Sequence, residues 1–113
     1  GGFTDPVGAR AGLAGLLVGF HEGDDLVFAG KVGTGFDTKL LLDLRTRLDQ
    51  LEIPRPPFTK AVGLPRLRAH WARPEIVVQV GFIEWTGNDK LRHPRLLSVR
   101  FDKNARDVVR ERP

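Results

Sequence analysis

The sequence predicts a mainly β protein, a small antiparallel barrel with one inserted amphipathic helix. Three observations support this class. Short runs rich in branched and aromatic residues recur between glycine and polar turns, which is typical of strands. Only residues 37–51 change to the spacing of a helix. With 113 residues, of which 41% are hydrophobic and 28% charged, the chain has the size and composition of one soluble domain over residues 1–113.

A hairpin is predicted near the start of the chain. The stretch "GLAGLLVGF", residues 12–20, is short, apolar and punctuated by glycine, so we expect a core strand. The polar "HEGDD" that follows suits a turn. Residues 26–32, "LVFAGKV", then alternate in the manner of a second strand.

The next segment predicts the helix and its end. Asp37 or Thr38 can cap it, and leucines then recur at helical spacing at positions 40, 41, 44, 48 and 51. Pro54 is expected to end the helix, because proline cannot donate to the helical hydrogen-bond ladder. Residues 53–73 hold further prolines, a glycine and five basic residues, which predict an irregular basic loop.

The remaining strands complete the predicted barrel. "EIVVQVGFIEWT", residues 75–86, alternates throughout and predicts the longest strand, with Gly81 at a bulge or bend. Residues 96–101 predict a final strand, and residues 104–113 a tail or short helix. A partly open OB-type barrel would protect the strand edges and offer a face for nucleic acid. An SH3-like barrel is the alternative on this pattern.

The charge is unevenly distributed. The formal net charge is +4, yet residues 90–113 contain eight basic and three acidic residues, and residues 53–73 contain five basic and no acidic residues. Two basic blocks are typical of a polyanion-binding face, although solvated loops would look the same. There is no cysteine, the three histidines are scattered, and no apolar run approaches the roughly 20 residues of a transmembrane helix. The absence of methionine suggests a piece excised from a longer polypeptide.

Three short segments could carry chemistry. "AGKVGTGF", residues 29–36, places glycines between a strand and a helix, where they could cradle phosphate or form a tight connection. "HWARPE", residues 70–75, offers an arginine for phosphate beside a histidine and a tryptophan that we expect to be structural. "RHPRLLSVRFDK", residues 92–103, surrounds an apolar strand with cations and ends in an Asp-Lys pair that could bind polyphosphate. No serine nucleophile with a base accompanies them, so the chain should not be a complete enzyme.

These segments together resemble the C-terminal OB domain of ATP-dependent DNA ligases. "GGFT" at the start resembles the junction that leaves the nucleotidyltransferase domain, and "AGKVGTGFD" is similar to the family's G-K-x-G-T-G-F element. "HWARPEIVVQVGFIEWT" and "LRHPRLLSVRFDK" are similar to its W-x-x-P strand and its nucleotidyltransferase motif VI. The resemblance covers essentially all 113 residues. It is strongest to the ligase module of the bacterial ligase D type, which serves in double-strand-break end joining.

The resemblance implies a role in nucleotidyl transfer: a lysine takes AMP from ATP, AMP passes to the 5′-phosphate at a nick, and the 3′-hydroxyl seals it. Motif VI would orient the β- and γ-phosphates in the first step, through Arg100, Asp102 and Lys103 with Arg92 nearby. The domain would then turn another face to the DNA minor groove. The expected DNA contacts are Lys31, Thr34, Gly35, Phe36, Arg73 and Arg95. The implied cofactors are ATP and Mg²⁺, held mainly by the nucleotidyltransferase domain.

The chain has neither the K-x-D-G adenylation motif nor the carboxylates that would hold the metals, so we expect it to be inactive alone. The implied partners are the nucleotidyltransferase domain of the same ligase, nicked or broken duplex DNA, and end-joining proteins, without a membrane. The implied location is the bacterial cytoplasm, at the nucleoid. Two alternatives stay open: a stand-alone OB module that binds nucleic acid without catalysis, and a relative of the mRNA capping enzymes, which share the motif VI logic.

Overall fold

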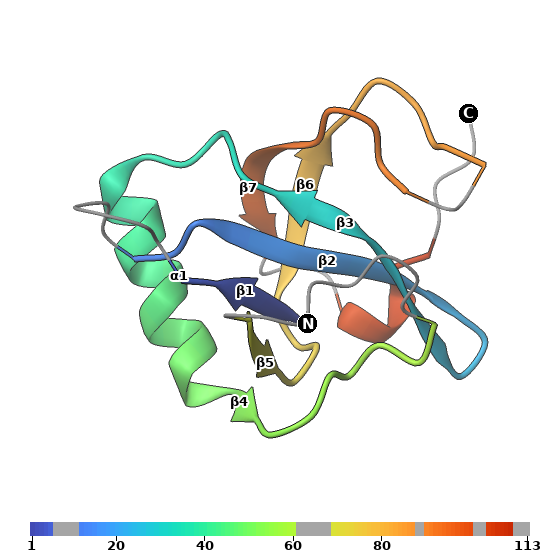
Figure 1. Ribbon diagram of the computed structural model, residues 1–113, viewed down its shortest axis with the longest axis horizontal. Coiled ribbons are helices and arrows are strands. Elements are labelled where there is room, and N and C mark those ends of the chain that lie inside the picture. The colour runs from blue at the N-terminus through green and yellow to red at the C-terminus, as the bar shows by residue number, and fades with distance from the viewer. Residues whose placement is uncertain (6–11, 61–68, 88–89, 101–103, 110–113) are drawn as a thin grey trace.

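Strands dominate the structure, a computed structural model that describes residues 1–5, 12–60, 69–87, 90–100 and 104–109. Figure 1 shows their arrangement with a single α-helix to one side. In chain order the elements are β1 (Gly2–Thr4), β2 (Gly15–Glu22), β3 (Asp25–Val32), α1 (Thr38–Gln50), β4 (Glu52–Ile53), β5 (Ala69–Ala72), β6 (Val77–Gly81), β7 (Arg95–Arg100) and a turn of 3-10 helix, η1 (Ala105–Asp107).

The strands form two antiparallel sheets. One has the order β3-β2-β1-β5-β4, and the other pairs β6 with β7. The Leu91 amide donates to the Ala29 carbonyl at 2.8 Å, and the Leu96 amide donates to the Thr34 carbonyl at 2.9 Å, so the chain around β7 lies beside β3. Among the described residues these single bonds, rather than a continuous ladder, join the sheets. The prediction of an antiparallel, mainly β fold with one helix is confirmed, and the barrel is partly open.

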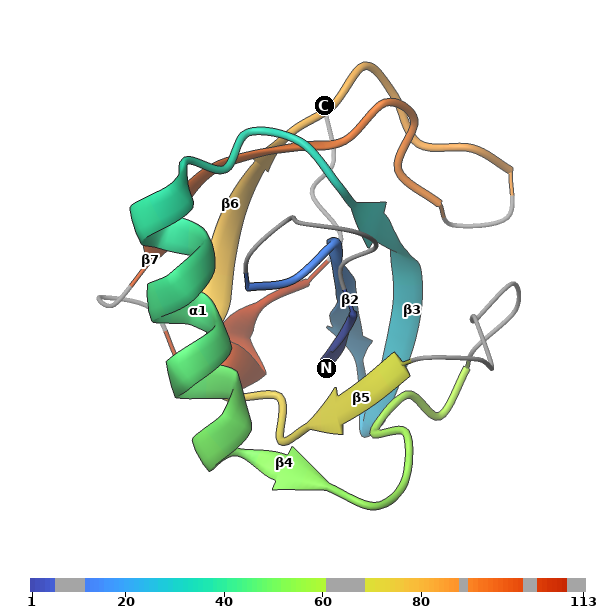
Figure 2. The same ribbon diagram turned by 60° about the vertical axis from the view of Figure 1, so that its left-hand side comes forward.

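The helix follows the sequence prediction closely. The Asp37 side chain accepts a hydrogen bond from the Leu40 amide at 2.7 Å and so caps the first turn. Leu44 is fully buried, and the leucines one turn before and after it also face the core. Figure 2 shows α1 running alongside the strands from the end of β3 to β4. The apolar stripe therefore attaches the helix to the barrel.

Several strand boundaries differ from the prediction. The stretch 75–86 does not form the longest strand, because regular pairing with β7 covers only Val77–Gly81, while β2 and β3 have eight residues each. The register shift lies between Gln79 and Val80 rather than at Gly81. Beyond β6 the chain enters a second, irregular pairing with residues 90–92.

The predicted loop over residues 53–73 is wrong at both ends, since Ile53 belongs to β4 and Ala69–Ala72 form β5. β1 was also not predicted as a strand. β1, β4 and β5 are short strands that pair with segments distant in sequence. β1, for example, lies between β2 and β5. Local patterns do not encode such partners.

A charged cluster fixes the start of the chain, as expected for a structural histidine. His70 Nε2 lies 2.8 Å from Asp5 Oδ2 and Nδ1 lies 3.3 Å from Glu52 Oε1, while the ring stacks on Phe3 at 4.9 Å. The hydrogen bond with His70 lowers the pKa of the Asp5 carboxyl, and Arg45, 3.1 Å away, acts in the same direction. The cluster thus links β1, β5 and the helix.

Candidate functional site

The cation-rich strand β7 forms the first part of the candidate site. Arg100 pairs with Val77 of β6 in the ladder, and its Nη1 donates to Gln79 Oε1 at 3.3 Å. This partner is a neutral amide, so the bond orients the guanidinium without cancelling its charge. At the other end of β7, the exposed Arg95 side chain lies over Gly81. Pairing with β6 therefore places both arginines at fixed positions along one strand.

Arg92 lies just before β7 in a hairpin-like pairing. Its amide donates to the Glu84 carbonyl at 2.9 Å, and its Nη1 lies 2.8 Å from Glu84 Oε1. Both side chains are more than half exposed, so the ion pair is worth only about 0–1 kcal/mol and can be exchanged for a phosphate. The following residue, His93, has a φ of +52°, uncommon for a residue other than glycine. A backbone of this kind bends the chain between Arg92 and β7, without reversing its direction.

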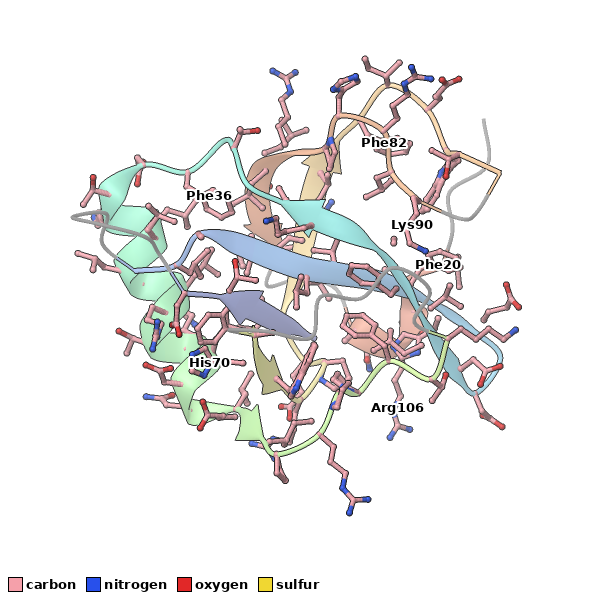
Figure 3. All side chains as sticks on the ribbon, viewed as in Figure 1. Phe20, Phe36, His70, Phe82, Lys90 and Arg106 are labelled. Carbon is pink, nitrogen blue, oxygen red and sulfur yellow. The ribbon has the colours of Figure 1, made fainter. Side chains whose placement is uncertain are left out.

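The glycine-rich loop at residues 33–36 packs directly against β7. Gly35 has a φ of +93°, and a Cβ atom there would collide with the carbonyl oxygen of Leu96. The Thr34 carbonyl accepts from the Leu96 amide at 2.9 Å. Phe36 is partly buried against the main core cluster, near the top of the helix in Figure 3. Glycine is thus required at position 35 for the loop to approach the strand.

The other expected DNA contacts are spread more widely. Lys31 is exposed on β3 and its stem lies over Gly15. Arg73 is exposed, with its Nε 3.2 Å from Glu75 Oε2. Within the described ranges no contact joins Arg73 to β7 or to the glycine loop. Asp102 and Lys103 lie outside the described residues.

Three further features around the site were not predicted: the side chains that bind two of the arginines, a cavity, and the aromatic residues that line part of it. Gln79 binds Arg100 and Glu84 binds Arg92, and neither residue was predicted to take part in the site. A cavity of about 230 Å³ lies between β2 and β6. Aromatic residues line part of it, with Phe20 and Phe82 each packing edge-on against Trp85 at 5.3–5.4 Å. The Arg100–Gln79 and Phe20–Trp85 contacts and the cavity arise from the pairing and packing of strands, so a local pattern could not reveal them.

Among the residues that the structure describes, no three histidine or acidic side chains are grouped so that they could hold a metal ion. In the same part of the chain, no helix has the length and apolarity needed to cross a membrane.

The comparison with known families decides what this domain is. Residues 9–103 match the model of the family described as "ATP dependent DNA ligase C terminal region". The chain belongs to this family. The match covers three of the four segments that resembled the family, and β7 lies within the segment similar to motif VI.

Relatives of this ligase C-terminal region include multifunctional end-joining proteins. The non-homologous end joining protein LigD of Pseudomonas aeruginosa is 34% identical over 119 residues, which cover 99% of this chain. LigD of Mycobacterium tuberculosis is 36% identical over 115 residues, which cover 98%. The chain spans 14–15% of the length of these relatives.

Solved structures show the same fold. The ligase domain of M. tuberculosis LigD superposes with a TM-score of 0.88 at 34% identity, covering 97% of this chain and 36% of that one. A mycobacterial DNA ligase D complexed with ATP and MES gives a TM-score of 0.83 at 33% identity, covering 98% of this chain and 36% of that one. The chain is therefore a ligase C-terminal region of the LigD type, with the predicted OB-type architecture.

Proposed function

We propose that this domain closes on the nucleotidyltransferase domain of an ATP-dependent DNA ligase and orients the phosphates of ATP while a lysine of that domain takes the AMP group. The domain then contacts nicked duplex DNA while the ends are sealed in double-strand-break repair. Phosphoryl transfer is catalysed chiefly by positioning and by stabilising charge, which suits a domain that supplies cations rather than a nucleophile.

The observation that carries this proposal is the arrangement of β7. Arg100 is held in place by its pairing with Val77 of β6 and by the hydrogen bond to the Gln79 side chain. Arg92 is held by an exposed carboxylate that phosphate can replace. Asp102 and Lys103 directly follow this strand in the sequence. We assign these four residues to the adenylation step, in which the β- and γ-phosphates leave as pyrophosphate. Mg²⁺ belongs to the partner domain in this proposal.

We assign the second, DNA-contacting role to the β3 and glycine-loop region. Lys31 and Thr34 are exposed there, and the loop's packing against Leu96 holds its backbone in place. Arg95 adds a second exposed cation from β7. Basic side chains that neutralise DNA phosphates supply affinity that falls as salt rises. Arg73 is a more distant member of the proposed DNA face.

Replacing Lys31 with alanine tests the DNA role. The affinity of the ligase for nicked duplex should fall, and the slope of log affinity against log salt should decrease by about one unit, because one phosphate contact is lost. Fluorescence anisotropy at several salt concentrations measures both quantities. Lys39→Ala is the matched control, since Lys39 is an exposed lysine at the start of α1, outside the proposed face. Equal losses in the two variants would remove Lys31 from the DNA interface.

A further inference from the structure

Gln79 joins the two strands of the smaller sheet through its side chain. It lies in the middle of β6, opposite Ser98 of β7, and is exposed. Its Oε1 accepts a hydrogen bond from Nη1 of Arg100 at 3.3 Å. Because Arg100 itself pairs with Val77, this bond runs diagonally across the ladder, at a spacing that long side chains can bridge.

Strand pairing alone does not fix the guanidinium of Arg100. Arg100 is the last residue of β7 and pairs with the first residue of β6, so the ladder holds its backbone at the end of both strands. The long arginine side chain loses much rotamer freedom when it is ordered. Arg100 and Gln79 both line the cavity of about 230 Å³, so on that side the guanidinium is not confined by packed neighbours. The hydrogen bond to Nη1 therefore restricts the part of the side chain that would meet a phosphate.

We propose that Gln79 is a positioning residue for nucleotidyl transfer: through its bond to Nη1 it holds the Arg100 guanidinium in the orientation that meets the ATP phosphates. This inference rests on the proposed function. Gln79 acts through Arg100 and does not itself touch the nucleotide. Orientation matters because a guanidinium binds phosphate best with two donors aligned, and a displacement of about 1 Å can cost on the order of a hundredfold in rate.

The test uses the complete ligase and measures the attachment of labelled AMP to the protein. Gln79→Leu keeps a side chain of similar size but removes the acceptor. In this enzyme kcat for adenylation should fall by about fivefold to twentyfold, while KM for ATP changes by less than about twofold. Sealing of a nick that already carries AMP should keep its normal rate, because that step uses no ATP. Gln79→Glu keeps an acceptor oxygen within reach of Nη1 and should restore most of the adenylation rate.

Gln50→Leu is the matched control. Gln50 is the other glutamine of the chain, is exposed, and is the last residue of α1. The same change of side chain is thus made on the helix, and the adenylation rate should stay within about twofold of normal. A loss equal to that in Gln79→Leu would overturn the proposal.

The Arg100→Ala enzyme shows whether Gln79 acts through Arg100. In that background Gln79→Leu should cause no further loss of adenylation rate, because the bond is already absent. A further loss as large as in the unchanged enzyme would overturn the proposal. A normal rate in Gln79→Leu, no recovery in Gln79→Glu, or an equal loss of adenylation and sealing would also overturn it.

Arg100→Ala also separates this failure from a failure of the proposed function. If Arg100→Ala slows adenylation and Gln79→Leu does not, only the role of Gln79 is wrong. If Arg100→Ala adenylates normally, the proposed function itself is wrong.

Discussion

Replacing Arg100 with alanine should lower the rate of adenylation of the ligase by ATP by a factor of about 100 or more. Removal of one well-placed group that stabilises developing charge typically costs about 10²–10³ in kcat. Arg100 is placed for this purpose by its pairing with Val77 and by its bond to Gln79. The measurement is the initial rate at which labelled AMP becomes attached to the protein.

Arg106→Ala is the matched control for this prediction. Arg106 lies on η1, is exposed, and is directed away from the body of the domain in Figure 3. Its loss removes the same charge and the same number of donors from a position only six residues away, and the adenylation rate should stay within about twofold. Similar losses in both variants would mean that overall charge, and not the position of Arg100, governs the reaction.

Replacing Gly35 with alanine should destabilise the domain by about 2–5 kcal/mol. The backbone at φ +93° costs an L-residue about 1–2 kcal/mol, and the new Cβ would strike the Leu96 carbonyl, which adds a cost of about 1–3 kcal/mol. Such a loss is a large part of the roughly 5–15 kcal/mol that stabilises a typical domain. Urea unfolding followed by tryptophan fluorescence measures the free energy of unfolding.

Gly87→Ala is the control, because a Cβ at Gly87 would have no heavy atom within 4 Å. Its free energy of unfolding should change by less than about 0.5 kcal/mol. If Gly35→Ala were as stable as the unchanged protein, the close approach of the glycine loop to β7 would be incorrect. The proposal that β7 holds the DNA-contacting loop in place would then lose its support.

The elements with strong local signals were predictable from the sequence. Asp37 and the leucine stripe predicted α1, and the polar segment at residues 21–25 predicted the β2–β3 hairpin, although only residues 23 and 24 lie outside the two strands. β1 and β5 were not predictable, because their strand character depends on pairing with each other across more than 60 residues. The strand over residues 75–86 was overestimated, because alternation continues past Gly81 while the pairing with β7 does not.

The arginines of the candidate site could be predicted from the sequence, but the side chains that bind them could not. The spacing of Arg92, Arg95 and Arg100 was visible in the sequence. Gln79 and Glu84 are separated from their arginines by 21 and 8 residues, so only the fold reveals the bonds. The glycines of residues 33–36 were assigned either to phosphate binding or to a tight connection. The collision expected at Gly35 supports the tight connection, which can hold exposed neighbours in place for DNA.

In the proposed function, this domain supplies the cationic groups that the nucleotidyltransferase domain needs for its adenylation. The most direct test compares the rate of AMP attachment to the nucleotidyltransferase domain when it is joined to this chain and when it is alone, with the same ATP and Mg²⁺. We expect the rate of AMP attachment to be about 100-fold higher or more when this chain is present. We also expect the Arg100→Ala form of the joined protein to lose most of that increase. Equal rates of AMP attachment with and without this chain would show that the chain takes no part in adenylation.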